Sequence, residues 1–359
     1  MGDLRRCLSR RIFGPFYHAL RGAQQHFAQL RDAYADISFD KKHEYRIRPG
    51  QSKVPFGWEN LQSSQNRIAL DRADALNSAV PSERDLGVFA YWTPEHVQKR
   101  WKDLSKKGLK TSGDYGIVGV GIYNGQGLNR AEANDDLYGV FHTTYPLELG
   151  FLGSAMSGQV LEVGSDIMGG YFNPTVTSMT LYEKDRRGRN IQVSATDISN
   201  SMPNNGKVKE ERVAVHAILF PQPFGLQAEW NWGKGPTLNL DGARYTTGTG
   251  AATTTFIRGE IKRENIGGGY VQAMYKIDNV FRPDGVMFPY FKWQTFRGAW
   301  KGANNNPNTM VDEYEAGVEY QIMKALELTL AYSHMERTNV NNLGEAGGDL
   351  GRAQLQWNY

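Results

Sequence analysis

The chain has 359 residues, a net charge of +3 and a mean hydropathy of −0.54. No stretch approaches the ~18 consecutive apolar residues that a transmembrane helix needs, so the composition excludes a helical membrane protein. The single cysteine, Cys7, excludes a disulfide framework. Forty glycines and abundant aromatic residues (16 Phe, 18 Tyr and 8 Trp) are typical of a protein with many strands and tight turns.

The amino-terminal segment, residues 1–24, differs from the rest of the chain. An exported barrel protein should begin with a signal peptide, which needs an apolar run of about 7–15 residues. Five arginines interrupt any such run here: Arg5, Arg6, Arg10, Arg11 and Arg21. We interpret residues 1–24 as an atypical segment left by truncation or by a misassigned start, and residues 25–359 as one barrel domain. An organellar presequence, rich in arginine and poor in acids, is the alternative.

Apolar and polar residues alternate with a period of two along most of the first half, which predicts β-strands. The predicted strands cover residues 31–39, 45–53, 84–92, 113–124, 136–146 and 159–172. Residues 94–108 lack the alternation and are expected to form a helix or loop. Two more strands are expected around residues 64–72 and 176–196.

The second half shows the same alternation more clearly. Its predicted strands cover residues 213–219, 226–232, 271–277, 287–293, 314–322 and 326–332, with a weaker pattern at 256–263. The short turn at 323–325 contrasts with the long loops at 302–309 and 337–349. Short turns at one end and long loops at the other are the topology of an outer-membrane barrel.

The last eight residues, 352–359, carry the strongest signal of fold class. Four apolar residues alternate with four polar ones, and the chain stops on an aromatic carboxyl terminus. In the closing strand of an outer-membrane barrel, the apolar face meets lipid and the polar face meets a wet lumen. The predicted fold is therefore all-β, a transmembrane antiparallel β-barrel of about 14–16 strands.

Several short motifs occur in order along the chain. The first is residues 50–57, Gly-Gln-Ser-Lys-Val-Pro-Phe-Gly, and others follow at residues 60–64, 71–72, 124–127, 227–230, 269–273, 317–320 and 352–356. The first motif resembles the GQxKxPFG segment of the phosphate-selective porin O and P family, and the others resemble later segments of that family. The resemblance implies a homotrimeric porin of the bacterial outer membrane, with 16 strands when complete. Its implied partners are small anions such as phosphate, outer-membrane lipid and lipopolysaccharide.

Strand parity places many charged side chains on the face opposite the apolar one, where they would line a pore. The basic candidates are Arg46, Arg48, Arg212, Arg258, Lys262, Lys276, Lys292 and Arg352. The acidic candidates are Glu229, Glu313, Glu315 and Glu319. Arginine suits phosphate because its planar fork binds oxyanions bidentately. The mixed signs favour a transverse field and a modest anion preference over a dedicated anion ladder.

The densest basic run, residues 184–189, is interpreted as a loop tip. Such a tip would be solvated, contact lipopolysaccharide phosphates, or fold into the pore as a constriction loop.

The predicted function is passive diffusion of small hydrophilic solutes through an outer-membrane porin, with a modest phosphate-type anion preference. The alternative is a soluble all-β carbohydrate-binding protein that uses exposed aromatic residues for sugars. We expect no enzyme, because the chain has no GxSxG motif and no P-loop. The seven histidines show no metal-ligand spacing, so neither a metal nor another cofactor is predicted, and no nucleic-acid partner is expected.

Overall fold

The structure is a computed structural model that describes most of the chain from residue 30 to residue 358. It leaves out residues 131, 133, 175–178, 185–189, 197–206, 240–243, 248–253, 259, 302–306, 324 and 340–343 within that range. The atypical segment 1–24 and most of the basic run 184–189 therefore lie outside the described residues.

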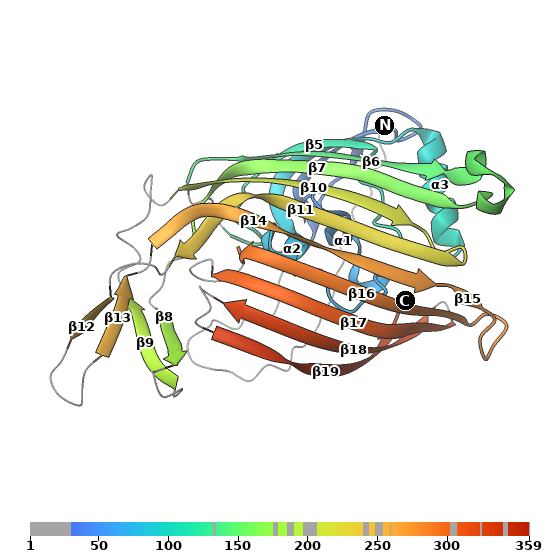
Figure 1. Cartoon of the computed structure of the whole chain (residues 1–359). Coiled ribbons are helices and arrows are strands. Elements are labelled where there is room, and N and C mark those ends of the chain that lie inside the picture. The colour runs from blue at the N-terminus through green and yellow to red at the C-terminus, as the bar shows by residue number, and fades with distance from the viewer. Residues whose placement is uncertain are drawn as a thin grey trace.

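One antiparallel sheet of 15 strands forms the wall of the molecule (Figure 1). Its strands follow one another in chain order: β1 (Ala33–Tyr34), β3 (Tyr45–Lys53), β4 (Arg84–Trp92), β5 (Val118–Tyr123), β6 (Tyr138–Glu148), β7 (Val160–Phe172), β10 (Val208–Leu219), β11 (Phe224–Asn239), β14 (Glu260–Tyr275), β16 (Val286–Ala299), β17 (Asn308–Met323), β18 (Leu326–Asn339) and β19 (Gly344–Trp357). The short β2 (Ile37–Ser38) pairs with β3, and β15 (Ile277–Asp278) pairs with β16. The all-β antiparallel fold and the predicted strand number are confirmed.

A second, four-stranded sheet has the order β12-β13-β9-β8. It contains β8 (Met179–Lys184), β9 (Asn190–Thr196), β12 (Arg244–Thr247) and β13 (Thr254–Arg258), and it lies beyond one end of the wall in Figure 1. The strand expected around residues 176–196 thus exists as two strands, but they pair in this sheet and not in the wall. The expected strand at 256–263 is likewise divided between β13 and β14.

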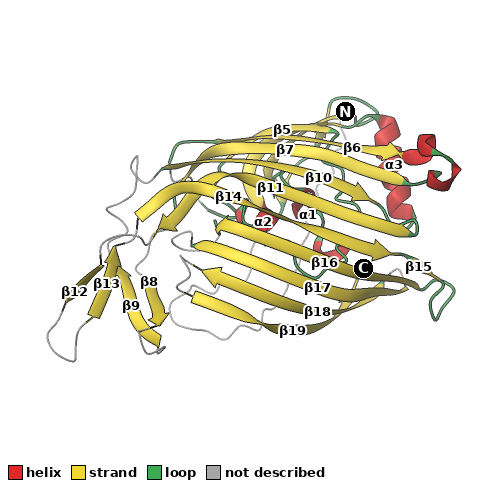
Figure 2. Ribbon diagram, viewed as in Figure 1, coloured by secondary structure: helices red, strands yellow, loops and turns green. Residues whose placement is uncertain are grey.

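Helices are short and few among the described residues (Figure 2). The predicted helical stretch at 94–108 forms α3 (Glu95–Lys106), which buries Val97, Trp101 and Leu104 at helical spacing. None of the described helices is long and apolar enough to cross a membrane.

The wall has one apolar face and one polar face, as its period-two pattern predicts. On β10, alternate side chains such as Arg212 and His216 are buried while Val215 is exposed. Large exposed apolar side chains cover the outer face, including Ile122, Phe141, Leu226, Trp230, Trp232, Val271, Tyr275, Leu330 and Leu355. A continuous apolar band of this kind is what lipid contact requires.

The segment between β3 and β4, residues 54–83, lies against the inner face of the wall, and we call it the inner segment. It contains α1 (Trp58–Leu61), the 3₁₀ turns at Ser64–Asn66 and Pro81–Glu83, and α2 (Asp74–Asn77). Helix α2 contacts β11, β14 and β16. Residues 64–72 therefore do not form the expected strand, because they lie within this compact segment and not in the wall.

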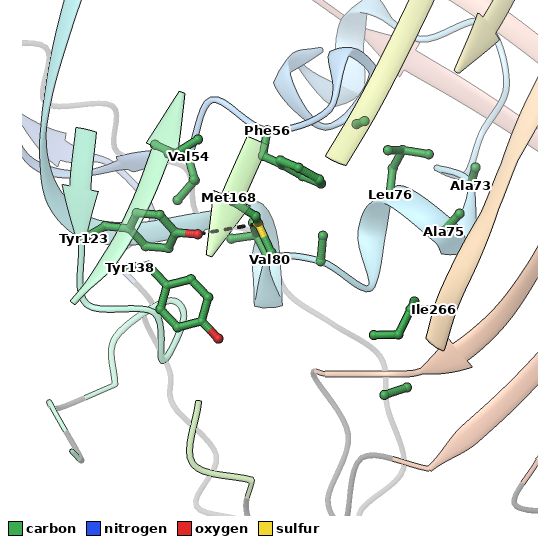
Figure 3. Close-up of a cluster of buried hydrophobic side chains, with 14 of the residues drawn as sticks. Val54, Phe56, Ala73, Ala75, Leu76, Val80, Tyr123, Tyr138, Met168 and Ile266 are labelled. Atoms are coloured by element: carbon green, nitrogen blue, oxygen red, sulfur yellow. Dashed lines mark hydrogen bonds between the residues drawn. The ribbon is translucent and has the colours of Figure 1, made fainter. Parts of the chain in front are cut away.

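An apolar cluster joins the inner segment to the wall. Figure 3 shows Phe56, Leu76 and Val80 of the inner segment beside Tyr123, Tyr138, Met168 and Ile266 of the wall strands. Phe56, Leu76 and Tyr138 are fully buried. At about 25 cal/mol per Å² of apolar surface, burying several such side chains stabilises the inner segment by several kcal/mol. The inner segment is thus a packed part of the fold.

Candidate functional site

Wall carboxylates hold the amino end of α1. The backbone amide of Gly57 donates to Asp166 Oδ2 at 2.7 Å, and those of Trp58 and Glu59 donate to the two Glu229 oxygens at 2.6 and 3.0 Å. The first amides of a helix have no partner within the helix, so carboxylates placed here satisfy them. Wall acids therefore fix where the inner segment begins.

The far side of the inner segment is held by charged residues of β16, β18 and β19. Lys292 is buried, forms an ion pair with Glu59 and donates to the Asp71 carbonyl at 3.0 Å. Three further contacts lie nearby: Arg337 with Asp74 at 2.8 Å, Arg352 with Asp71, and Arg352 with Glu315. The inner segment is thus connected to opposite parts of the wall.

The predicted basic residues of β3 and β10 are on the inner face, but each has a partner. Arg46 pairs with Asp114 at 2.7 Å, and Arg48 pairs with Asp36 at 2.7 Å. Arg212 is fully buried against Glu210 at 2.7 Å and donates to the Ser78 hydroxyl at 3.0 Å. These guanidinium groups hold the interior together instead of forming a continuous basic track.

The other predicted basic residues do not lie together in the structure. Lys276 pairs with Asp278 at 2.8 Å next to β15, and Lys262 is exposed on β14. Arg258 ends β13 of the small sheet, and its side chain lies outside the described residues. Of these predicted residues, Lys292 and Arg352 contact the inner segment.

The four predicted acidic residues are buried on the inner face. Glu229 holds α1, as described above. Glu313 accepts from Gln294 Nε2 at 2.8 Å, and Glu315 accepts from the Tyr290 hydroxyl at 2.7 Å. Glu319 pairs at 2.9 Å with Lys110, which follows α3. Each of these carboxylates is therefore used in a local contact.

A basic pocket beside the inner segment was not predicted from the sequence. It has a volume of about 570 Å³ and is lined by six cationic residues: Arg31, Arg48, Lys53, Arg67, Arg72 and Arg84. Three carboxylates, Asp32, Glu83 and Asp114, and the hydroxyls of Ser63 and Ser64 also line it. Lys53 belongs to the GQSKVPFG motif, and this motif was the feature of the sequence that could have indicated the pocket.

Arg67 is the distinctive residue of the basic pocket. Among the described residues, its buried Nε and Nη1 atoms have no hydrogen-bond partner, whereas Nη2 donates to the Leu70 carbonyl at 3.2 Å. Burial, together with the like charge of Arg67, lowers the pKa of Arg72 to about 10. Both observations indicate a locally positive site with unused N–H donors.

One group of described residues has the donor atoms to hold a metal ion. A ring nitrogen of His216 and one carboxylate oxygen each from Asp166 and Glu229 lie within 4.8 Å of one another, and all three residues are buried.

Comparison with known proteins identifies a family whose model matches this chain. The family model for phosphate-selective porin O and P matches residues 15–359, which is nearly the whole chain. Comparison with curated proteins gave no match. The family model spans the β3 motif, the inner segment and all later strands of the wall. The chain therefore belongs to the phosphate-selective porin O and P family.

Proposed function

We propose that the protein is an outer-membrane pore for passive diffusion of small hydrophilic solutes, with a modest preference for anions such as phosphate. The observation that carries this proposal is the basic pocket, in which six cationic residues face three carboxylates. Arg67 has no ion-pair partner among the described residues, so its charge adds to the positive potential of the pocket. A phosphate-like oxyanion can exchange part of its hydration shell for guanidinium groups of the pocket and for the Ser63 and Ser64 hydroxyls.

The expected preference is modest for a physical reason. One unpaired charge 4 Å from an anion contributes about 1 kcal/mol in bulk water and about 4 kcal/mol at an effective dielectric constant near 20. A wet pore is nearer the first value, which corresponds to about a fivefold preference. The carboxylates Asp32, Glu83 and Asp114 oppose a deeper anion well because they pair with Arg84, Arg72 and Arg46.

Reversal potentials across planar bilayers under a salt gradient test the proposal. Arg67→Gln removes a guanidinium that has no ion-pair partner among the described residues, and it is expected to lower the chloride preference, most clearly at low salt, where the Debye length is about 10 Å at 0.1 M. The matched control is Arg282→Gln, which removes an exposed arginine paired with Asp284 at 3.5 Å. Cation preference in the unmodified pore, or an unchanged preference in Arg67→Gln, would refute the proposal.

We also propose that the apolar band contacts outer-membrane lipid, with lipopolysaccharide at the surface, and that the chain assembles as a homotrimer. The exposed side chains of Leu226, Trp230 and Leu355 support lipid contact. Membrane fractionation separates this proposal from a soluble carbohydrate-binding protein. A porin stays in the membrane at high salt and needs detergent for release, whereas a soluble protein does not.

A further inference from the structure

A cluster of histidines and carboxylates lies on the inner face of four neighbouring strands, β6, β7, β10 and β11. His142 lies directly opposite Asp166, and His216 lies directly opposite Glu229 in the strand register. All four residues are at most 4 % exposed. The sequence could not indicate this cluster, because its members are 13 to 87 positions apart and only the sheet brings them together.

Hydrogen bonding at Nε2 of the His216 ring leaves the other ring nitrogen, Nδ1, without a proton. The Thr144 hydroxyl donates to Glu162 Oε1 at 3.2 Å, so it accepts from His216 Nε2 at 3.1 Å. This arrangement places the ring proton on Nε2 and a lone pair on Nδ1. Nδ1 is buried and has no hydrogen-bond partner within the part of the chain that the structure describes. A neutral imidazole fixed in this way has the protonation state of a metal ligand.

Gly164 of β7 gives the His216 ring its position. It lies opposite His216 in the register, and a Cβ there would be 2.6 Å from His216 Cε1. The absence of a side chain at residue 164 therefore lets the ring extend across β7 toward Thr144.

The carboxylates of the cluster have no lysine or arginine partner among the described residues. Within the described part of the chain, neither Asp166 nor Glu229 forms an ion pair with a lysine or arginine, although both are buried. Asp166 Oδ1 is 2.5 Å from His142 Nδ1, and its Oδ2 accepts from Gly57. Each carboxylate oxygen has a second lone pair and remains able to bind a cation.

We propose that His216 Nδ1, Asp166 and Glu229 bind a divalent cation of the zinc type, with His142 as a positioning residue for Asp166. One nitrogen and two carboxylate donors suit zinc, whereas magnesium and calcium prefer oxygen ligands alone. Ligands at about 2.0–2.2 Å from zinc are about 3.4 Å apart in a tetrahedron. A ring nitrogen of His216 and one oxygen of each carboxylate lie within 4.8 Å of one another, which exceeds the tetrahedral separation by at most about 1.4 Å. The cation would join the wall acids that hold α1, and so fix the inner segment.

Metal titration of the folded, detergent-extracted protein after chelation tests this site. We expect one Zn²⁺ retained per chain and a rise in melting temperature with Zn²⁺. His216→Gln keeps a polar group near the position of Nε2, beside Thr144, but removes Nδ1. It should weaken zinc binding by tenfold or more. The matched control, His334→Gln, removes an exposed histidine that is 2.8 Å from Asp349, and it should leave binding unchanged.

Three results would overturn the proposal: substoichiometric zinc in the unmodified protein, equal affinity in His216→Gln, or loss of binding in His334→Gln. Co²⁺ substitution and X-ray absorption of the unmodified protein decide the matter even where His216→Gln does not fold. A low-symmetry cobalt spectrum with one histidine in the coordination shell supports the site. A fully hydrated ion refutes it.

Discussion

The ion pair between Lys292 and Glu59 offers the sharpest test of how the inner segment is held. Lys292 is 3 % exposed, lies 4.6 Å from the Tyr270 ring centre and donates to the Asp71 carbonyl. Lys292→Met keeps the side-chain length but leaves the buried Glu59 carboxylate without its counter-charge. Removing one partner of a buried pair costs about 3–5 kcal/mol. Glu59 keeps the Ala73 amide at 2.7 Å, so we expect the lower value, about 3 kcal/mol.

A cost of about 3 kcal/mol raises the population of the released inner segment about 100-fold. Hydrogen exchange followed by mass spectrometry measures this directly, because the Trp58 and Glu59 amides are protected by Glu229. Their protection should fall about 100-fold in Lys292→Met, while the wall strands stay protected. The double variant Lys292→Met/Glu59→Gln should recover most of the loss, since it removes the stranded charge.

The control for this experiment is Lys276→Met, which removes a lysine paired with Asp278 at 2.8 Å next to β15. It should leave exchange in the inner segment unchanged. Unchanged protection in Lys292→Met would refute the inference that this ion pair holds the inner segment. Equal loss in the single and double variants would show that packing, not charge, was disturbed.

Three other predictions follow from the same structure. Val271→Arg places a charge on the exposed apolar face and should lower folding stability in lipid vesicles by about 2–4 kcal/mol, whereas Val271→Leu should not. Deleting residues 350–359 leaves the Leu326–Ser333 part of β18 without its partner, so heat-modifiable barrels should not form. Burial raises the pKa of Asp74 from 3.8 to about 6, so its deprotonation disfavours the docked inner segment. Exchange protection there, corrected for intrinsic rates, should fall as pH rises from 4 to 6, and Asp74→Asn should flatten that change.

The wall was predictable from the sequence because its physical requirement is local. Each spanning strand needs one apolar face, so period-two alternation gave the parity of residues such as Leu226 and Leu355. The pattern also places Trp293 and Tyr320 on the outer face, but these two side chains are half-buried and not fully exposed, because of specific contacts. Trp293 lies 6.3 Å from Trp230, and the Tyr320 hydroxyl donates to the Val280 carbonyl at 2.9 Å.

The inner segment was not predictable from local pattern. Residues 64–72 resemble a short strand, and their true environment is set by contacts with residues more than 200 positions away, such as that between Asp71 and Lys292. Parity placed Glu229 and Lys292 on the inner face, but it gave no information about their partners. The amide donors of Trp58 and Glu59 were invisible for the same reason, because backbone groups leave no trace in a sequence pattern.

The hydrogen-bond and ion-pair partners of the wall acids explain how a lumen with many acids is compatible with the proposed anion preference. Wall carboxylates such as Glu229 and Glu315 accept amide, hydroxyl or guanidinium donors, so much of their field is cancelled within about one hydrogen-bond length. Among the described residues, the buried nitrogens of Arg67 have no such partner. The wall acids are therefore locally compensated, whereas the charge of Arg67 is not and adds to the potential of the basic pocket. Selectivity in such a pore depends on which charges remain unpaired, and counting charges by strand parity does not give that information.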